Sequence, residues 1–176
     1  KKVKIGYSDA PDTQLGPLAM ERQRRRVEGY IEKGKETADL VTGGQRPSHL
    51  NRGYFIEPTL FANVDNASVI AQEEIFGPVL SLIPCEDEED AVRIANESNY
   101  GLNGSVLTHD HEAAYKIARR IRSGGVAQNG MRADFSLPFG GFKQSGIGRE
   151  GGAEGLAAYL ETKTILLNGR PARFAN

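Results

Sequence analysis

Cysteine, tryptophan and long apolar runs are scarce or missing in this sequence of 176 residues. The single cysteine, Cys85, excludes an internal disulfide framework and a cysteine-rich metal site. The uninterrupted apolar runs are short, so we expect neither a membrane span nor a secretory signal segment. One cysteine is also consistent with a reducing compartment. These absences predict a cytoplasmic protein that has no membrane partner.

The net charge is also close to zero, because the sequence has 22 Lys and Arg residues and 23 Asp and Glu residues, which gives a formal charge of -1. Such a chain has no overall field that would attract nucleic acid. The one basic run, at residues 22–26, is offset by nearby glutamates and has no interleaved aromatics. A solvated helix face is therefore favoured over a nucleic-acid site.

What is present is an alternation of helical and extended patterns in a globular composition. Apolar spacing predicts helices at 18–33, after the acidic run 86–90, around 114–121 and at 150–160, with Gly34 ending the first. Strands are expected at 38–41, 79–83, 105–108, 126–129 and 162–167. The run at 79–83 should be buried on both faces, and the stretch at 54–61, interrupted by Pro58, suits an edge or irregular strand. The alternation predicts an α/β fold, with a mostly parallel sheet and crossover helices.

A glycine pattern precedes the last predicted helix. Gly146, Gly148 and Gly151 fit G-x-G-x-x-G, which alone would suggest a small dinucleotide-binding module. No apolar strand leads into the pattern, and no acidic residue follows about 20 positions later, where a ribose partner is expected. We therefore favour glycines that adopt positive φ or let the backbone pass close to a neighbour.

Three further candidates for chemistry have plainer interpretations. His109 and His111 could be taken for a metal pair, but Asp110 between them suits a helix N-cap, and no other His or Cys is near in the sequence. Cys85 precedes five acidic residues, whose field disfavours the thiolate, and has no adjacent base. The acidic run at 86–90 itself suits the positive end of a helix better than a cation site. We expect none of the three to be a catalytic or metal site.

The segment QEEIFGPV at 72–79 combines two carboxylates with an aromatic, a glycine and a proline. A carboxylate here could accept hydrogen bonds from sugar hydroxyls, and the aromatic could pack on a flat ring. A charged loop before a strand is an equally good interpretation of the spacing alone.

Three long motifs resemble, in the same order, the C-terminal part of the NAD(P)-dependent aldehyde dehydrogenase superfamily: EEIFGPV at 73–79, NYGL at 99–102 and PFGGFKQSGIGRE at 138–150. Shorter matches, QLGPL at 14–18, GYFIEPTL at 53–60 and ETKT at 161–164, extend the resemblance over nearly the whole chain. The family combines an α/β cofactor domain, an α/β catalytic domain and an oligomerisation segment. The resemblance implies that residues 1–160 belong to the catalytic domain and that residues 161–176 form the oligomerisation strand and tail.

On the cofactor side, the resemblance implies three contacts with NAD or NADP. Glu74 resembles the carboxylate that holds the nicotinamide ribose hydroxyls. Phe76 resembles the aromatic beside that ribose and the nicotinamide, and Gln23 resembles a ribose-side contact from a helix. These roles rest on the family match and not on spacing.

On the substrate side, the resemblance implies that Phe139 is an aromatic wall of the aldehyde tunnel and that Phe135 lies in the loop shaping it. Glu150 matches a glutamate that, in betaine aldehyde dehydrogenase relatives, pairs with a lysine in a proposed charge relay. The backbone of Lys143 and Gly146 matches a potassium site described in some of those relatives.

The groups that perform the family's covalent chemistry have no counterpart here. In the family, a cysteine attacks the aldehyde, an asparagine helps to stabilise the oxyanion, hydride passes to the nicotinamide and a glutamate activates water. Their segments, like the cofactor's phosphate-binding loop, precede those present here, and Cys85 does not align with the nucleophile. We expect part of an enzyme that oxidises an aldehyde to a carboxylic acid through a cysteine thiohemiacetal, with this chain inactive when isolated. A non-catalytic scaffold or oligomerisation fragment is the alternative.

The strand-like run at 162–167 has no later predicted element to cover its apolar residues. An exposed edge of this kind favours pairing with another chain, and the resemblance assigns the position to pairing in dimers and tetramers. We expect a homodimer or homotetramer whose interface includes Ile165 and Leu167. A strand that completes the chain's own sheet is the alternative.

Overall fold

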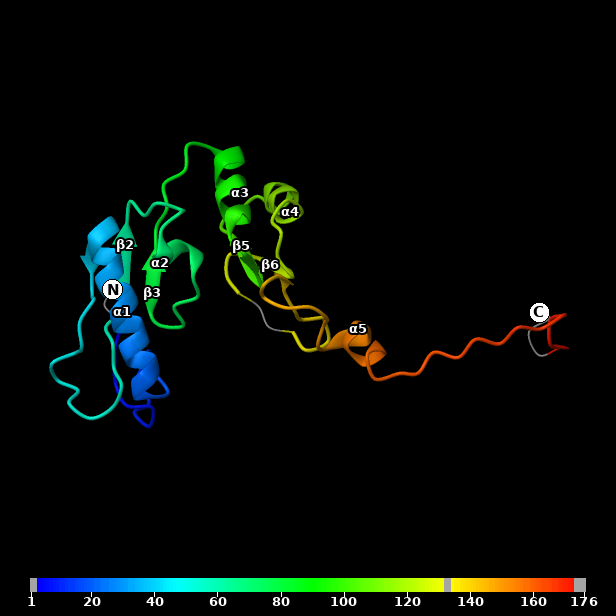
Figure 1. The fold of residues 1–176 in the computed structure, drawn as a ribbon, viewed down its shortest axis with the longest axis horizontal. Coiled ribbons are helices and arrows are strands. Elements are labelled where there is room, and N and C mark those ends of the chain that lie inside the picture. Colours follow the sequence, from blue (N-terminus) through cyan, green and yellow to red (C-terminus); the bar gives the residue numbers. More distant parts are fainter. Residues whose placement is uncertain (1–2, 132–133, 173–176) are drawn as a thin grey trace. The chain divides into compact units, whose positions relative to one another are not determined.

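The computed structural model describes residues 3–131 and 134–172. They fall into two compact units, an N-terminal unit within Lys1–Asn99 and a C-terminal unit within Tyr100–Asn176. Figure 1 labels the helices and strands in chain order. Both units combine helices with strands, which confirms the predicted α/β class. None of the helices in the described ranges is long and apolar enough to cross a membrane.

A mixed sheet of three strands, in the order β1-β2-β3, organises the N-terminal unit. β1 (Asp39–Thr42) pairs antiparallel with β2 (Thr59–Ala62), and β2 pairs parallel with β3 (Val79–Ser81). β2 is therefore the central strand, and the expectation of an edge or irregular strand was wrong. Pro58 lies just before β2, so its missing N–H interrupts no ladder bond, and the next amide already donates to Pro78 O at 2.8 Å.

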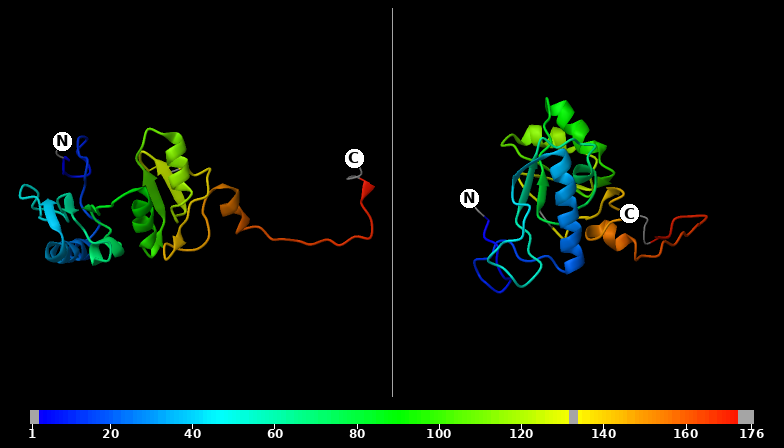
Figure 2. Two further views of the ribbon diagram at one scale, coloured as in Figure 1. Left: turned by 90° about the horizontal axis from the view of Figure 1, so that it is seen from above. Right: turned by 60° about the vertical axis from the view of Figure 1, so that its left-hand side comes forward.

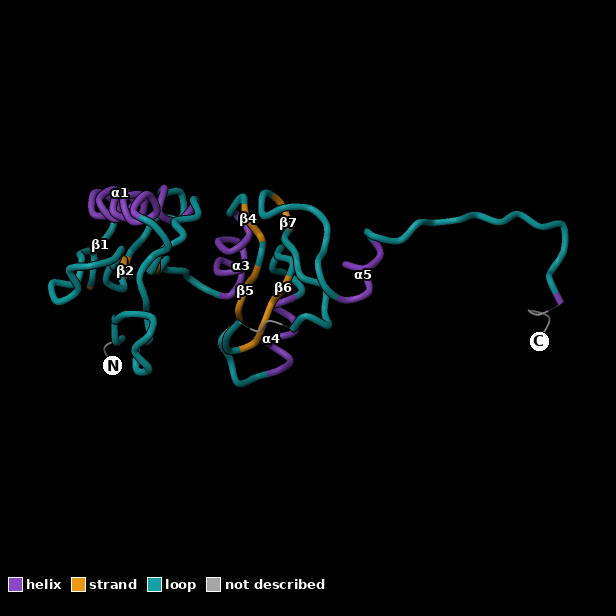
Figure 3. Tube along the Cα trace, turned by 90° about the horizontal axis from the view of Figure 1, so that it is seen from below, coloured by secondary structure: helices purple, strands orange, loops and turns teal. Residues whose placement is uncertain are grey.

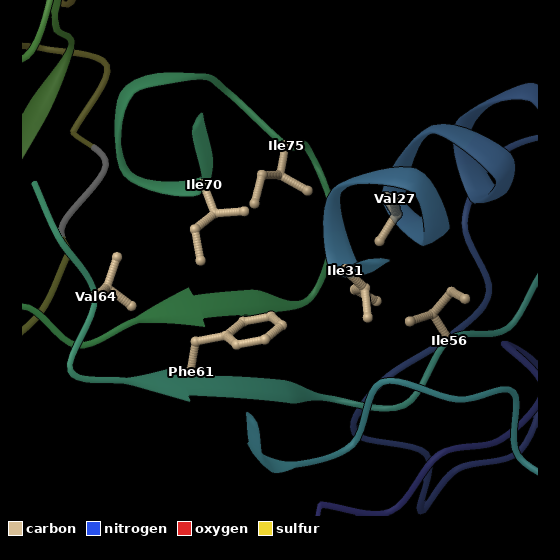
Figure 4. Close-up of a cluster of buried hydrophobic side chains, with 7 residues drawn as sticks. All are labelled: Val27, Ile31, Ile56, Phe61, Val64, Ile70 and Ile75. Carbon is tan, nitrogen blue, oxygen red and sulfur yellow. The ribbon is translucent and has the colours of Figure 1, made fainter. Parts of the chain in front are cut away.

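Helix α1 (Glu21–Thr37) lies along one face of this sheet (Figure 3). Its apolar stripe packs on β2 and on the short helix α2 (Val69–Gln72). Figure 4 shows the buried side chains of this core: Val27, Ile31, Ile56, Phe61, Val64, Ile70 and Ile75. Burial of such side chains contributes about 1.5–3 kcal/mol each, so this cluster is the main stabilising feature of the unit.

The bounds of α1 differ from the predicted 18–33 at both ends. Leu18 donates its amide to Tyr54 O at 3.0 Å and Met20 is extended, so the helix begins at Glu21. Gly34 does not end the helix but lies within it. A Cβ there would come within 2.7 Å of Phe61 Cζ, so this glycine lets the aromatic ring pack directly against the helix backbone.

β3 is not buried on both faces, contrary to the prediction. Leu80 is 58% exposed and Leu82 is 48% exposed. β2 is the only strand paired with β3 among the described residues, and α1 covers only one face of the sheet. The apolar run therefore keeps one open face in this chain.

Helix α3 (Glu88–Glu97) follows the acidic run and confirms its interpretation as helix-start charge. The N-cap residue Asp87 accepts a hydrogen bond from the backbone N of Asp90 at 2.8 Å. The carboxylates in the first turn lie where the positive end of the helix stabilises them.

In the C-terminal unit, the parallel strands β5 (Asn103–Val106) and β6 (Gly125–Gln128) are joined through helix α4 (His111–Ala118). This is the predicted crossover, and α4 contacts both strands (Figure 2). The Asp110 side chain accepts hydrogen bonds from the amides of Glu112 and Ala113, which confirms it as the N-cap. The short strands β4 (Tyr100–Gly101) and β7 (Phe142–Lys143) pair antiparallel. The described pairings are thus both parallel and antiparallel.

The end of the chain differs from the prediction. Helix α5 (Gly152–Ala157) is shorter than the expected 150–160, because Gly151 and Gly152 adopt positive φ at its start. The predicted strand at 162–167 is not formed, since no described strand pairs with it. Ile165 and Leu167 are 68% and 61% exposed. The alternative, a strand completing the chain's own sheet, is therefore not what the described residues adopt.

Candidate functional site

The turn between α2 and β3 presents two exposed side chains on a buried anchor. Ile75 is part of the core, whereas Glu74 is exposed and the Phe76 ring is 73% exposed. An exposed aromatic next to a carboxylate offers one flat apolar surface and one hydrogen-bond acceptor. This arrangement suits a ligand that carries both a ring and hydroxyl groups.

Side chains of α1 hold the backbone of this turn. Gln23 Nε2 donates to Ile75 O at 3.0 Å and to Phe76 O at 2.8 Å. Arg26 Nη2 donates to Glu74 O at 2.6 Å. Three successive carbonyls are therefore bound by one helix. The structure brings together Gln23, Glu74 and Phe76, the three residues expected on the cofactor side. The Gln23 amide binds the backbone of Ile75 and Phe76, and the Glu74 carbonyl is bound by Arg26 instead.

A further hydrogen bond fixes the start of the turn. Tyr30 OH donates to Glu73 Oε2 at 2.5 Å, and the Arg26 guanidinium lies 5.5 Å from the centre of the Tyr30 ring. The pKa of the Tyr30 phenol is raised above its usual value, mainly by the hydrogen bond to Glu73 and to a lesser extent by partial burial. Tyr30 therefore stays protonated and donating through the neutral range.

The turn is also strained and tightly packed. Phe76 has φ +56°, a left-handed conformation that is uncommon for residues other than glycine. A Cβ on the neighbouring Gly77 would lie 2.5 Å from Val27 Cγ2, so the backbone here presses on α1. Only a well-determined environment maintains such a conformation.

The substrate-side candidates lie in the C-terminal unit, in the loops that precede and follow the short strand β7 between β6 and α5. Phe139 and Glu150 form an isolated antiparallel bridge, each donating its amide to the carbonyl of the other at 2.7 Å. Phe139 is 50% exposed and Phe135 is 92% exposed. The Glu150 side chain is exposed as well. The structure therefore places two aromatics and a carboxylate on one backbone-paired loop.

The glycines of this loop confirm the expectation of positive φ and close approach. Gly146, Gly148 and Gly151 have φ of +118°, +84° and +69°. A Cβ on Gly151 would lie 2.8 Å from Leu137 O and 3.0 Å from Phe135 O. The pattern is a tight turn that follows the two-residue strand β7.

The candidate potassium ligands lie in a turn of the same loop. Lys143 has φ +54°, and its carbonyl accepts the Gly146 amide at 3.3 Å. Arg149 Nη1 binds the carbonyls of Gly141 and Gly148 at 3.1 and 2.7 Å, which places a cation beside this turn.

The other polar candidates are the histidine pair and Cys85. His111 Nδ1 lies 2.8 Å from Gln128 Oε1, which occupies one ring nitrogen. His109 and His111 line an open hollow of about 380 Å³ at the carboxyl ends of β5 and β6. No group of three or more His, Cys, Asp or Glu residues able to hold a metal occurs in the described part of the chain. Cys85 is a free, exposed thiol.

Sequence reasoning missed Arg26 and Tyr30. Arg26 lies in the basic run that is predicted to be a solvated helix face, and Tyr30 lies in the predicted helix at 18–33 with no role assigned to its side chain. The missed signal was the spacing of Gln23, Arg26 and Tyr30 at i, i+3 and i+7, which places all three on one face of α1.

The chain is similar to known aldehyde dehydrogenases in both sequence and structure. Residues 1–165 match the sequence model of the aldehyde dehydrogenase family. Geranial dehydrogenase of Castellaniella defragrans is 52% identical over 157 residues, which cover 89% of this chain and 33% of that protein. Among solved structures, an aldehyde dehydrogenase of Mycobacterium tuberculosis complexed with NAD+ aligns with a TM-score of 0.91 and 54% identity, covering 94% of this chain and 34% of that one. Betaine aldehyde dehydrogenase of Staphylococcus aureus, also complexed with NAD+, aligns with a TM-score of 0.90 and 39% identity over 99% of this chain and 36% of that one. The chain thus spans about a third of the length of these relatives.

Proposed function

The chain belongs to the aldehyde dehydrogenase family, and we propose that it forms the C-terminal part of an enzyme that oxidises an aldehyde to a carboxylic acid with NAD or NADP. In this proposal, residues 1–160 contribute the nicotinamide-ribose contact and one side of the substrate tunnel. The observation that carries the proposal is the braced turn at residues 73–77, which presents Glu74 and Phe76 to solvent.

The residues of this turn fit the ribose end of a nicotinamide cofactor. A carboxylate can accept hydrogen bonds from two neighbouring hydroxyls, and an exposed ring can lie against a flat heterocycle. Glu74 is not hydrogen-bonded or ion-paired through its carboxylate to any described residue, so that acceptor is available. NAD or NADP, when bound, accepts the hydride that leaves the substrate.

The protein's own contribution on this side is orientation. Glu74 would hold the ribose by its hydroxyls, Phe76 would limit movement of the adjacent ring, and Gln23 would secure the backbone of Ile75 and Phe76. Holding the reacting parts in one geometry lowers the entropic part of the barrier. Removing the Glu74 charge should therefore slow hydride transfer and have little effect on the free energy of unfolding.

On the substrate side, we propose that Phe139 and Phe135 line the path of the aldehyde. The bridge between Phe139 and Glu150 fixes the spacing of the aromatic and the carboxylate along the loop. Glu150 would take part in proton relay with a lysine, and the Lys143 and Gly146 backbone would hold potassium. We assign the cysteine nucleophile to a segment outside this sequence, because Cys85 lies on an exposed connection next to acidic residues.

The test of the cofactor role is Glu74→Gln in the intact enzyme that carries this segment. We expect single-turnover hydride transfer to slow by about tenfold or more, because an amide replaces only part of the acceptor strength of a carboxylate. Glu36→Gln, an exposed change on α1, is the matched control. Unchanged hydride transfer in Glu74→Gln would remove the proposed role.

The isolated chain provides a second test. We expect no reduction of NAD or NADP in the presence of an aldehyde, because no thiolate is placed to attack the carbonyl. Reduction above background that disappears in Cys85→Ser would overturn this assignment.

We also propose that the segment at 161–172 and the tail after it mediate assembly into a homodimer or homotetramer. The support is the exposure of Ile165, Leu166 and Leu167, which are 68%, 90% and 61% exposed. Three neighbouring apolar side chains in water favour a covered state. Deleting residues 164–176 should lower the mass measured by light scattering, and full assembly after the deletion would contradict the proposal.

A further inference from the structure

The turn at residues 73–77 is restrained in more ways than an exposed loop requires. Gln23 and Arg26 bind the carbonyls of Glu74, Ile75 and Phe76, and Tyr30 binds the Glu73 carboxylate. Below the backbone, Gly77 abuts Val27. All four contacting side chains come from two turns of α1, so a single helix determines the conformation of the turn.

These restraints maintain a strained backbone conformation that would otherwise relax. Phe76 keeps φ +56° although its ring is 73% exposed and gains little from burial. A left-handed aromatic residue costs free energy, and such strain persists where the surroundings over-determine it. Because a change of φ at Phe76 would redirect its ring and the adjacent carboxylate, the restraint fixes the directions of both side chains.

The two neighbouring glutamates are used differently. The Glu73 carboxylate accepts the Tyr30 hydroxyl at 2.5 Å, whereas the Glu74 side chain is exposed and only its backbone carbonyl is bound, by Arg26 at 2.6 Å. One carboxylate therefore anchors the turn while the other stays available to a ligand.

We propose that Tyr30, paired with Glu73, and Arg26 are positioning residues that hold Glu74 and Phe76 in their ligand-binding geometry. The inference rests on the proposed cofactor role of those two residues. Tyr30 and Arg26 themselves would not touch the cofactor. They would act through the turn, and their loss would let Phe76 leave the left-handed region.

The first experiment measures the turn in this chain without any cofactor. In Tyr30→Phe and in Arg26→Gln, amide hydrogen exchange of the residues at 74–79 should become about three- to tenfold faster, because each change removes one charge-assisted hydrogen bond. Tyr159→Phe, at a tyrosine that is 86% exposed, is the matched control and should leave the exchange unchanged. Exchange in β2 monitors folding of the unit.

Two conservative variants keep the test decisive if one of these chains folds poorly. Glu73→Gln retains an acceptor for Tyr30, and Arg26→Lys retains a single donor for Glu74 O. Each should give a smaller increase than Tyr30→Phe or Arg26→Gln. Wild-type exchange rates at 74–79 in every variant that folds would overturn the proposal.

The second experiment uses the intact enzyme and separates positioning from loss of folded protein. In Tyr30→Phe, we expect KM for the nicotinamide cofactor to rise about three- to tenfold, whereas a smaller active fraction would lower only kcat. If the turn loosens and KM stays unchanged while Glu74→Gln alters it, the positioning role is overturned. If Glu74→Gln also leaves hydride transfer and KM unchanged, the proposed cofactor site itself fails.

Discussion

The two units of this chain are stabilised by different means. Among the residues that the structure describes, nine of the eleven buried hydrophobic ones lie in the N-terminal unit, so the described interior of the C-terminal unit contains little apolar volume. In the N-terminal unit, α1 and the sheet enclose one continuous cluster around Phe61 (Figure 4). In the C-terminal unit, the buried hydrophobic residues are Val106 and Ala114.

Close backbone contacts at glycine replace side-chain packing in the C-terminal unit. A Cβ on Gly124 would lie 1.6 Å from Gly140 O, and one on Gly101 would lie 2.4 Å from Arg122 O. Only glycine allows such approaches. The unit with the apolar core braces a strained turn, whereas the glycine-rich unit leaves the aromatic rings of Phe135 and Phe139 exposed.

The largest expected effect is on the core of the N-terminal unit. Phe61→Ala should lower the unfolding free energy of that unit by about 3–5 kcal/mol, because it removes a fully buried ring and leaves a cavity. Urea denaturation followed by hydrogen exchange of N-terminal peptides measures this loss. Phe135→Ala, at a ring that is 92% exposed, is the control and should change stability by less than about 0.5 kcal/mol.

In the C-terminal unit, a glycine substitution should cause the corresponding loss of stability. Gly124→Ala should cost about 2–3 kcal/mol, because the added methyl group overlaps Gly140 O and the backbone must move apart. The measurement is the loss of exchange protection in β5 and β6. Gly169→Ala has open space around it and should be neutral. A Gly124→Ala chain as stable as the wild type would contradict the account of this unit.

The stability of the two units can also be compared through their helix N-caps, because each unit contains a helix capped by an Asp side chain. Asp87→Ala at α3 and Asp110→Ala at α4 should each cost about 1 kcal/mol of helix stability. Loss of the cap should unfold a larger fraction of the C-terminal unit than of the N-terminal unit, because the C-terminal unit has less buried apolar surface to stabilise its fold. Circular dichroism on thermal unfolding, with Asp9→Ala as an exposed control, tests this. Equal sensitivity of the two units would argue against the difference in their stabilisation.

Local chemistry was predictable from the sequence, whereas features set by distant neighbours were not. Asp87 and Asp110 were identified as helix-start residues because a cap depends only on the next few residues. Gly34 was wrongly given the end of α1, since only the position of Phe61 shows that this glycine serves packing. The predicted strand at 162–167 is not formed within this chain, because a strand needs a partner that no local pattern supplies. The family motifs indicated Glu74, Phe76 and Gln23, but not Tyr30, whose role depends on a residue 43 positions away.

The smallest expected effect is a pH dependence in the N-terminal unit. Arg46 holds Glu28 of α1 through both carboxylate oxygens, at 2.5 and 2.9 Å. This hydrogen bond from Arg46 lowers the pKa of Glu28, against the opposing effect of burial. A carboxylate with a lowered folded-state pKa adds stability above its ordinary pKa of about 4.3, and that stability is lost as pH falls through the folded-state value.

Arg46→Gln should therefore reduce the stability of the N-terminal unit slightly at pH 7 and hardly at all at a pH low enough to protonate Glu28 in the folded state. Urea titrations of both chains at the two pH values measure the difference. Arg52→Gln is the matched control, an exposed arginine on the loop before β2. Added salt should shrink the effect at pH 7, because the Arg46 guanidinium is solvent-exposed and screened. An Arg46→Gln penalty that is equal at both pH values would show that packing of the arginine stem, and not its charge, connects this loop to α1.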